Sequence, residues 1–331
     1  MRTIIHFMGM KSTKFGGLEK FMAALIRYNS DYRFILVYDE YPVSSEYINV
    51  LYSYDALVEV VDFKSMGFIK QLNAYRRLFR KYTPDIVHFH FSLNHFGALA
   101  ARLSGITRIY KTVHSCMTNN SIDIESFRQL GLRQQIGFVG GFANKLYTGI
   151  LFVSDYTYNQ YVKVFGPSVS YQRIYLGVEQ RTIHDIVKPD DLGIIPEDFK
   201  IITTIAFAHP LKGVDVLIRA IPQIPKAVFL IIGLNDCEYT EQLKASAIRL
   251  GVNDRIRWIG IKDDVLPYLG VTDIYVQPSR TEALSLAACE ALSFGKPVVG
   301  SNVGGLPEVS TILFENENYS DLARCINSLI N

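Results

Sequence analysis

Two glutamates, Glu282 and Glu290, are candidates for chemistry because of the elements expected around them. The apolar run Ile274–Gln277 and the stretch Pro297–Gly300 predict two strands, and Ala283–Phe294, rich in Ala and Leu, predicts a helix between them. Two parallel strands joined by a helix bind ligands at the carboxyl ends of the strands. The first glutamate falls at that edge and the second inside the helix. On spacing alone, two such glutamates are more often ordinary solvated side chains.

The start of this predicted helix is suited to an anion. Its first N–H groups, on Ala283, Leu284 and Ser285, have no partner within the helix and lie at the positive end of the helix dipole. Glu290 follows Ser285 by five residues, about 7.5 Å along the axis at ~1.5 Å per residue. A diphosphate on these N–H groups would place a ribose against Glu290 and the group beyond the diphosphate near Glu282. The pattern therefore predicts one site for ribose, phosphates and a sugar.

A lysine lies in a comparable loop earlier in the second half of the chain. The strand predicted for Ile201–Phe207 is followed by a helix predicted for Val214–Ile221, and Lys212 and Gly213 lie in the loop that joins them. A lysine ammonium is a mobile point charge that suits a diphosphate. Lys212 is therefore a second candidate for binding phosphates.

The first half of the chain offers a glycine pair and a histidine at similar places. Gly16 and Gly17 follow the strand predicted for Arg2–Met8 and would let the backbone come close to a phosphate or sugar, although tight turns use such pairs for geometry alone. His114 follows the strand predicted for Ile109–Val113. A lone histidine is usually structural, but this one sits at the edge where α/β proteins place their sites.

Two further histidines, His88 and His90, alternate along the strand predicted for Pro84–His90 and so share one face. Such a pair suggests a metal, but a metal site needs a third ligand and the sequence places none nearby. We interpret both as polar residues near the strand end.

These motifs together resemble those of the retaining glycosyltransferases of family 4, of the kind that build bacterial polysaccharides and glycoconjugates. The resemblance covers nearly the whole chain. It rests on the E-x7-E string with its flanks Pro278-Ser279, Gly295-Lys296-Pro297 and Gly304-Gly305-Leu306-Pro307-Glu308, on KGVDVLIRA around Lys212, and on Gly16-Gly17-x-Glu19.

The resemblance implies the GT-B architecture, in which two Rossmann-like α/β domains with parallel sheets face a central cleft. We expect an acceptor-side domain over residues 1–180, a linker over 181–200 and a nucleotide-sugar-binding domain over 201–331. The implied reaction moves a sugar from a nucleotide diphosphate sugar, with a UDP sugar favoured, to a hydroxyl acceptor. The acceptor would be a lipid-linked or polysaccharide saccharide, and the anomeric configuration would be retained.

The resemblance also implies a role for each candidate residue. Glu282 would hold sugar hydroxyls, Glu290 the ribose, and His114 would contact the donor sugar. Lys212, the helix start and the glycine-pair amides would stabilise charge on the leaving diphosphate. The chain contains no Asp-x-Asp sequence, so we expect turnover without a metal or other cofactor.

The chain departs from the family pattern at Phe207, where the family usually has an arginine five residues before the lysine. His209 or Arg280 would have to replace this second cation on the diphosphate. Two alternatives therefore stay open. One is a catalytically impaired partner subunit that stabilises another glycosyltransferase, and the other is a different GT-B enzyme, such as a nucleotide-sugar epimerase. After Glu308 the family usually has a longer loop and then a C-terminal helix that crosses back to the first domain, whereas here only Ser320–Ile330 remains. We therefore expect the crossing helix to be short or absent.

Composition and charge set wider limits. At 331 residues the chain is expected to form two domains. Its four cysteines have neither disulfide nor metal spacing, which favours a reducing compartment. No apolar run approaches the ~18–20 residues of a spanning helix, and the first residues read as a strand rather than a signal peptide. We expect a cytoplasmic protein, with the inner face of the cell membrane as a possible place of work, and no nucleic acid partner.

The charge is uneven. Residues 1–180 carry 20 Lys and Arg against 13 Asp and Glu, a balance of +7, whereas residues 181–331 carry 14 against 19, a balance of −5. The basic first half is consistent with peripheral contact with an anionic membrane. It is equally consistent with a solvated surface whose charge is merely uneven. Two segments are candidates for that contact: the basic amphipathic helix predicted for Phe68–Tyr82, which is more often a sheet-covering helix, and Ser115–Tyr147.

Overall fold

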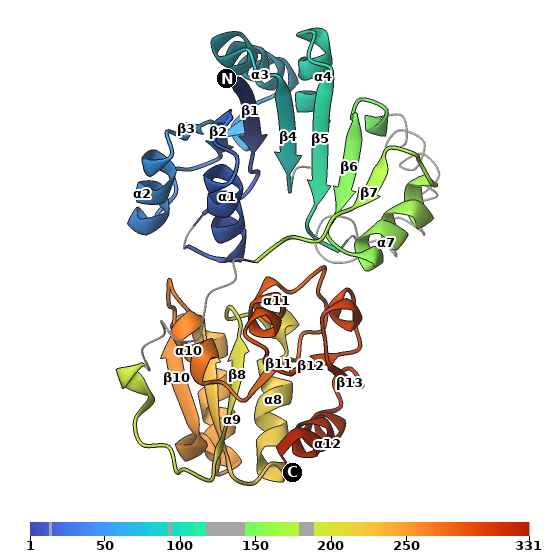
Figure 1. Cartoon of the computed structure of the whole chain (residues 1–331). Coiled ribbons are helices and arrows are strands. Elements are labelled where there is room, and N and C mark those ends of the chain that lie inside the picture. The colour runs from blue at the N-terminus through green and yellow to red at the C-terminus, as the bar shows by residue number, and fades with distance from the viewer. Residues whose placement is uncertain (13–14, 92–94, 117–142, 179–188, 331) are drawn as a thin grey trace. The chain divides into compact units, whose positions relative to one another are not determined.

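The computed structural model describes residues 1–12, 15–91, 95–116, 143–178 and 189–330. The chain forms two compact units, Met1–Gly177 and Val178–Asn331. Each unit is built on one parallel β-sheet with helices on both faces (Figure 1). Both units therefore have the Rossmann-like α/β class expected from the sequence.

The first unit holds a sheet of seven parallel strands in the order β3-β2-β1-β4-β5-β6-β7. Its register pairs His6 on β1 with His88 on β4, and His90 on β4 with Thr112 on β5. Register partners on parallel strands point to the same face. The strands are β1 (Arg2–Phe7), β2 (Tyr32–Tyr38), β3 (Leu57–Val60), β4 (Ile86–His90), β5 (Arg108–Val113), β6 (Gly149–Phe152) and β7 (Tyr171–Arg173).

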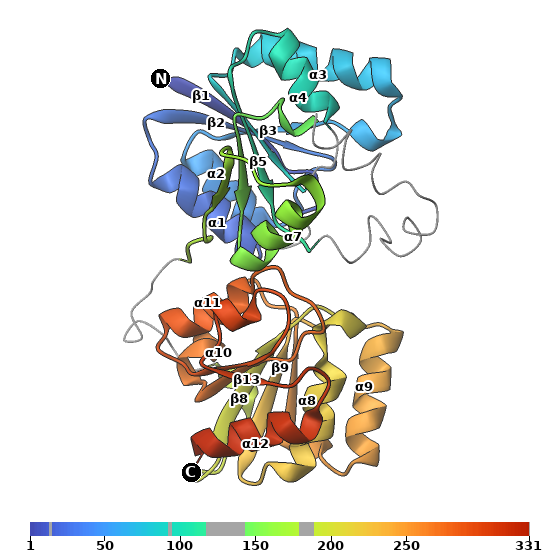
Figure 2. The ribbon, with the colours of Figure 1, turned by 90° about the vertical axis from the view of Figure 1, so that its right-hand side faces the viewer.

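Helices cover both faces of this sheet, each over its own apolar core. One core lies under α3 and α4 and the other under α1 and α2, as Figure 2 shows from the side. The helices of the unit are α1 (Gly17–Arg27), α2 (Ser45–Ser53), α3 (Phe68–Tyr82), α4 (Phe96–Leu103) and α7 (Asp155–Phe165), with the 3₁₀ turn η1 (Phe63–Ser65).

Helix α3 covers the sheet, which is one of the two interpretations of its amphipathic pattern. Tyr75, Phe79 and Tyr82 are buried in the core. Phe68 is instead 48% exposed. It is the first residue of the helix and packs edge to face on Phe96, with ring centroids 4.7 Å apart. Most of the second candidate segment, residues 117–142, lies outside the described residues.

The second unit holds six parallel strands in the order β10-β9-β8-β11-β12-β13. The central strand β9 is buried throughout, as its uninterrupted apolar sequence predicts. The strands are β8 (Lys200–Ile205), β9 (Ala227–Ile232), β10 (Ile256–Gly260), β11 (Ile274–Gln277), β12 (Val298–Ser301) and β13 (Ile312–Phe314).

The helices of this unit divide between the two faces of its sheet. Helices α8, α9 and α12 pack over the main core, and α10 and α11 lie on the opposite face (Figure 2). Within the described part of the chain, no helix is both long and apolar enough to cross a membrane. The helices are α8 (Val214–Ala220), α9 (Glu238–Arg249), α10 (Leu266–Val271), α11 (Leu286–Ser293) and α12 (Tyr319–Ile330), with 3₁₀ turns η3 (Asp190–Leu192), η4 (Pro210–Lys212), η5 (Ile221–Gln223), η6 (Asn253–Arg255) and η7 (Leu306–Glu308).

Candidate functional site

Lys212 and Glu282 meet in an ion pair at the carboxyl edge of the second sheet. Lys212 ends the turn η4 after β8, and Glu282 lies in the loop after β11. These strands are neighbours, so the loops at their carboxyl ends come together although the residues are 70 positions apart. The distance from Lys212 Nζ to Glu282 Oε2 is 2.7 Å, and the two side chains are 18% and 13% exposed.

Two glycines allow the backbones around this pair to approach closely. Gly213 has φ +65°, and a Cβ there would lie 1.8 Å from the carbonyl oxygen of Pro278. Gly304 has φ +59°, and a Cβ there would lie 2.0 Å from the carbonyl oxygen of Glu282. The N–H of Gly305 donates to that same oxygen at 2.9 Å. The loop that carries the glutamate is thus held through its backbone.

Buried polar side chains hold the carboxylate of Glu282 from below. Ser279 Oγ donates to Glu282 Oε2 at 3.3 Å and accepts from Gln277 Nε2 at 2.8 Å. Gln277 Oε1 in turn accepts from Tyr275 at 2.7 Å and from Ser285 at 3.0 Å. The sequence analysis did not assign Gln277 or Ser279. The signal was a glutamine that ends an otherwise apolar strand, a polar group that burial would force to find partners.

The residue that replaces the family's arginine lies beside the lysine. Phe207 is 51% exposed, and Lys212 Nζ lies 5.1 Å from the centroid of its ring. A cation over an aromatic face is attracted to it, by about 0.5–1 kcal/mol at exposed sites. Phe207 therefore contacts the cation but adds no positive charge of its own.

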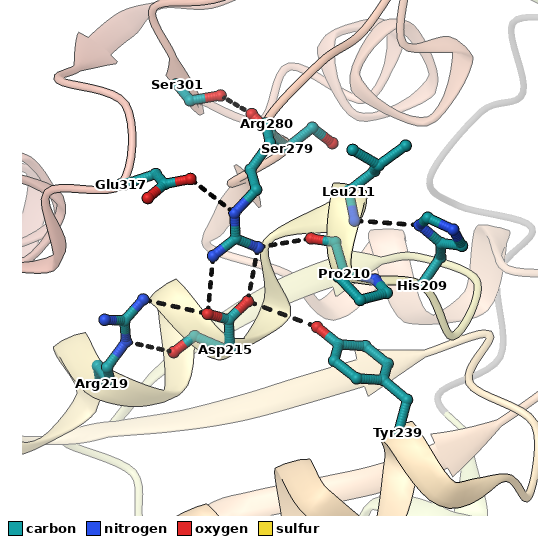
Figure 3. A network of polar contacts seen from close by, with 10 residues as sticks. All are labelled: His209, Pro210, Leu211, Asp215, Arg219, Tyr239, Ser279, Arg280, Ser301 and Glu317. Carbon is teal, nitrogen blue, oxygen red and sulfur yellow. Dashed lines mark hydrogen bonds and ion pairs between the residues drawn. The ribbon is translucent and has the colours of Figure 1, made fainter. Parts of the chain in front are cut away.

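Arg280, considered as a substitute for the missing arginine, is committed to a different network (Figure 3). Its Nη1 and Nη2 bind the two carboxylate oxygens of Asp215 at 2.8 and 2.9 Å, and its Nε donates to Glu317 at 2.8 Å. Burial works to raise the pKa of Asp215, but the hydrogen bonds and charge of Arg280, with the charge of Arg219, lower it overall. The guanidinium is thus engaged on both edges, and its service as a second cation on the diphosphate stays a prediction.

His209, the other suggested substitute, also has an internal partner. Its Nδ1 accepts the backbone N–H of Leu211 at 3.1 Å, which caps the turn η4 (Figure 3). The side chain thus helps to shape the loop that carries Lys212.

The helix that carries Glu290 begins later than predicted. α11 starts at Leu286, with Ser285 as its N-cap, so Ala283 and Leu284 belong to the preceding loop and are buried. The cause is Ser285, whose Oγ accepts the N–H of Ala288 at 3.2 Å. A serine cap satisfies one of the first N–H groups and sets the boundary against the helix propensity of alanine and leucine. The predicted anion site at the amides of Ala283–Ser285 is therefore not a helix N-terminus.

Glu290 lies on α11, five residues beyond the cap, and is partly buried. Both glutamates act on the buried hydroxyl of Tyr275. Burial is the largest cause that raises its pKa well above the ordinary value, and the charges of Glu290 and Glu282 add to it. The charges of both glutamates of the E-x7-E string thus act on one buried tyrosine.

The remaining candidate residues belong to the first unit. Gly16 is the N-cap of α1 in extended backbone, Gly17 is the first helical residue, and no side chain of the described residues caps this helix. His114 directly follows β5 and is partly buried. Its Nε2 lies 2.8 Å from His90 Nδ1.

The histidines of this sheet correct another expectation. His6, His88 and His90 place one ring nitrogen each within 4.8 Å of one another, so a third potential metal ligand does lie near His88 and His90. It was missed because His6 is far away in the sequence, on β1, which becomes the neighbour of β4 only in the folded sheet. Burial, as the largest cause, lowers the pKa of all three rings, that of His88 to about 4.

The chain matches two family models. Residues 15–181 match the model of glycosyltransferase family 4, and residues 198–331 match that of the glycosyl transferases group 1.

Two curated relatives illustrate the similarity. The UDP-Gal:alpha-D-GlcNAc-diphosphoundecaprenol alpha-1,3-galactosyltransferase of Escherichia coli is 26% identical over 285 residues, which cover 79% of this chain and 70% of that protein. The GDP-mannose-dependent alpha-(1-6)-phosphatidylinositol monomannoside mannosyltransferase of Mycolicibacterium smegmatis is 31% identical over 177 residues, which cover 48% of this chain and 45% of that protein. The match thus spans less than half the length of the mycobacterial relative.

Solved structures show the same fold across the whole chain. Anabaena HepE in complex with UDP has a TM-score of 0.77 at 20% identity and is matched over 100% of this chain and 90% of its own. WaaG, a glycosyltransferase involved in lipopolysaccharide biosynthesis, has a TM-score of 0.69 at 14% identity, over 99% and 90%. With half of its length matched by the family model, this chain belongs to glycosyltransferase family 4, and its two parallel-sheet units have the GT-B fold.

Proposed function

We propose that this chain transfers a sugar from a nucleotide diphosphate sugar to a hydroxyl of a saccharide acceptor, with retention of the anomeric configuration. The observation that carries the proposal is the ion pair of Lys212 with Glu282 at the carboxyl edge of the second sheet. In a family 4 chain, Lys212 is assigned to the leaving diphosphate and Glu282 to the sugar, so this ion pair brings both assigned groups to one place. Glu290 on α11 is assigned to the ribose.

Donor binding exchanges the partners of this ion pair. The donor diphosphate replaces the Glu282 carboxylate on Lys212 Nζ, and the carboxylate turns to accept hydrogen bonds from sugar hydroxyls. Ser279 stays bound to the carboxylate from the buried side during this exchange, and Gln277 holds the Ser279 hydroxyl in turn. In the absence of donor, each charge of the pair compensates the other. Either charge alone would be costly in free energy, because both side chains are largely removed from water.

The chemical step breaks the bond between the sugar's anomeric carbon and the diphosphate oxygen. The bonding electrons leave with the diphosphate, whose growing charge Lys212 stabilises. The acceptor hydroxyl oxygen bonds to the same face of the anomeric carbon, and its proton passes to the leaving diphosphate oxygen. His114 contacts the donor sugar, and the amides at Gly16 and Gly17 face the diphosphate. No Asp-x-Asp sequence is present to hold a metal at the diphosphate, so we propose that turnover needs no divalent cation.

The names of the relatives support a UDP sugar and a lipid-linked acceptor. The match to the E. coli galactosyltransferase, whose name gives UDP-Gal as donor and a diphosphoundecaprenol saccharide as acceptor, extends over 285 residues. The HepE structures hold UDP, UDP-glucose, or UDP with glucose. We propose that the chain works at the cytoplasmic face of an anionic membrane on such a lipid-linked acceptor, a place of work that its basic first half would suit (+7 over residues 1–180, 20 Lys and Arg against 13 Asp and Glu).

The test is a transfer assay with the purified full chain. UDP-galactose, UDP-glucose and GDP-mannose are each offered with a diphosphoundecaprenol-linked N-acetylglucosamine, in EDTA and in Mg²⁺. We expect product with one UDP sugar, equal rates in both buffers, and an α-linkage by NMR from the α-configured donor. Strict dependence on Mg²⁺ would refute the metal-free mechanism, and a β-linkage would refute retention.

A second candidate function is a catalytically impaired partner subunit that stabilises another glycosyltransferase. The observation in its favour is that Phe207 stands in place of the usual arginine while Arg280 is committed to Asp215 and Glu317. Transfer by the purified chain alone would eliminate this candidate. A folded chain that binds a sugar nucleotide but transfers nothing, until a second glycosyltransferase is added, would favour it.

A further inference from the structure

Three histidines of the first unit form one continuous line from the interior of the sheet to its carboxyl edge. His6 Nδ1 lies 3.0 Å from His90 Nε2, and His90 Nδ1 lies 2.8 Å from His114 Nε2. The ring centroids are 5.3 and 5.1 Å apart, with interplanar angles of 22° and 31°. Such separations occur when imidazole rings are joined edge to edge along N–H···N hydrogen bonds. Both ring nitrogens of His90 thus take part in this line of contacts.

Each of these rings is neutral at ordinary pH. Burial is the first cause that lowers the pKa of His6 and His90 well below the usual value and that of His114 to about 3, and the charge of His88 adds to it in all three. A neutral imidazole carries one N–H and one bare nitrogen. Each contact in the line therefore has one donor and one acceptor. The N–H groups of all three rings must then point in the same direction along the line.

Only two arrangements satisfy that condition, and they differ at the inner end. His6 Nε2 is buried and has no partner among the described residues. If the hydrogen bonds run inward, this nitrogen must carry a proton and becomes a buried N–H without an acceptor. If they run outward, it is a bare nitrogen. Orphaned buried N–H groups are rarer in proteins than under-satisfied acceptors, so the outward direction is favoured.

We propose that His6 and His90 are positioning residues that hold His114 as the Nδ1–H tautomer, so that it presents a hydrogen-bond donor at the carboxyl edge of the first sheet. In this arrangement His6 Nδ1–H donates to His90 Nε2, and His90 Nδ1–H donates to His114 Nε2. His114 Nδ1 then carries the remaining proton. It has no partner among the described residues, and His114 as a residue is not fully buried, so this N–H is the group left for a ligand. The ligand it suits is a neutral or anionic oxygen.

The same rings could instead be used as metal ligands, because His6, His88 and His90 lie close together. A metal requires the bare nitrogens of three rings to converge on one point. Here His90 directs its two nitrogens to opposite neighbours, and His88 Nε2 lies 2.7 Å from the hydroxyl of Thr112. The hydrogen-bonded line therefore describes the rings better, and metal binding becomes an outcome of the test.

The test reads the tautomers directly. The full chain is labelled with ¹⁵N-histidine, and long-range ¹H–¹⁵N correlation spectra separate protonated from bare ring nitrogens. The seven histidines are assigned by single substitutions. We expect a protonated Nδ1 and a bare Nε2 for His114 in the wild-type chain. The opposite tautomer of His114 would overturn the proposal. So would a joint change of the His6, His88 and His90 signals on addition of Zn²⁺, which would show that the three rings bind one metal ion.

A matched pair of variants tests the line itself. His6→Phe keeps a ring of similar shape against Phe34, with which His6 stacks at 5.9 Å, but removes the first donor. We expect the His114 signals to move to the Nε2–H tautomer or to a mixture. His88→Phe, on the same face but outside the line, should leave them unchanged. An unchanged tautomer in a folded His6→Phe chain would contradict the proposal, and the wild-type spectrum decides the direction even if that variant does not fold.

A binding arm rests on the proposed function and separates the two ideas. If His114 contacts the donor sugar, His6→Phe should weaken binding of the UDP sugar roughly fivefold, the worth of one hydrogen bond, and leave UDP itself unchanged in calorimetry. If His6→Phe shifts the His114 tautomer in NMR without any loss of sugar affinity, the line of histidines is supported. The sugar contact assigned to His114 would then be rejected.

Discussion

Lys212 Nζ lies 2.7 Å from Glu282 Oε2, so the side chains assigned to the leaving group and to the sugar bind each other. Both are largely shielded from solvent, and Ser279 adds a hydrogen bond to the same carboxylate oxygen. The site therefore stores its cation and its carboxylate as a neutral pair. Any donor must compete with Glu282 for Lys212. Removing the carboxylate should therefore strengthen nucleotide binding but slow the transfer of the sugar.

Glu282→Gln should separate nucleotide binding from transfer. The amide can accept a hydrogen bond from Lys212 but carries no charge to pair with it, so the ammonium is released more easily to the diphosphate. We expect UDP to bind several-fold more tightly, since an ion pair worth up to ~1 kcal/mol no longer competes. Transfer should fall about 100-fold or more because the sugar loses its carboxylate. Calorimetry with UDP and initial rates of transfer measure the two effects.

The control for this substitution is Glu197→Gln, which changes an exposed glutamate of the same unit and should alter neither quantity. Weaker UDP binding in Glu282→Gln would contradict the exchange of partners. It would mean that the ion pair positions Lys212 for the nucleotide rather than competing with it.

Phe207→Arg should strengthen the diphosphate site. The side chain is half exposed and already lies beside Lys212, so a guanidinium there can be accommodated without opening the core. A charge-assisted hydrogen bond is worth about 1.5–3 kcal/mol, so we expect at least a tenfold gain in affinity for UDP, measured by calorimetry. Phe207→Gln, polar but uncharged, should not reproduce the gain.

The same variant decides between the two candidate functions. If the wild-type chain transfers slowly or not at all and Phe207→Arg raises the rate, the missing cation limits catalysis. No gain in either affinity or rate would show that position 207 does not face the diphosphate in this chain.

That Lys212 and Glu282 lie at one edge of the sheet was predictable because each follows a parallel strand, whereas their ion pair depends on β8 lying beside β11. The strands themselves could be recognised from short apolar runs bounded by glycine and proline. The start of α11 could not, because alanine and leucine continue the helical pattern outward to Ala283. One serine hydroxyl outweighs that preference by capping the helix at Ser285.

Contacts that depend on strand order lay beyond the sequence. His6 pairs with His88 because β4 lies beside β1, on the side opposite β2. Arg280 binds Asp215 because the loop after β11 and the first turn of α8, 65 positions apart, meet at the same edge. Neither partner follows from local spacing, so the histidine pair was interpreted without its third member, and the arginine was treated as an available cation.

Gly304→Ala should destabilise the second unit and abolish donor binding. A Cβ there would lie 2.0 Å from the carbonyl oxygen of Glu282, and the residue has φ +59°. Backbone must move to relieve this contact, and it is the backbone that positions the glutamate. We expect a loss of more than about 2 kcal/mol in the free energy of unfolding, beyond the ~1 kcal/mol that a left-handed conformation costs alanine.

Gly251→Ala is the matched control, because it has φ +66° with no atom within 4 Å of the added Cβ. It should show the conformational cost alone and bind UDP as the wild type does. Denaturant unfolding followed by the fluorescence of Trp258, the chain's one tryptophan, measures both variants. Equal losses in the two variants would show that the close approach to Glu282 is not the cause.

Acid should destabilise the first unit before the second. The described histidines of the first unit, His6, His88, His90, His95 and His114, all have a lowered pKa, with burial as the largest cause and values of about 4 for His88 and His95 and about 3 for His114. In the unfolded chain they take up protons near the ordinary pKa of ~6.5. Between pH 6.5 and about 4 the unfolded state thus binds more protons, and stability falls as the pH falls.

Other charged groups near these rings do not reverse the sign. Lys111, whose pKa burial lowers to about 8, stays charged throughout this range, and its charge further lowers the pKa of His95. Hydrogen exchange of peptides from β1, β4 and β5 should therefore accelerate as the pH is lowered from 7 to 4.5, after correction for the intrinsic pH dependence of exchange. Trp258 fluorescence should report an intact second unit over the same range. His88→Asn should flatten the response, since one titrating ring is removed, and an unchanged slope in that variant would show that the histidines do not cause it.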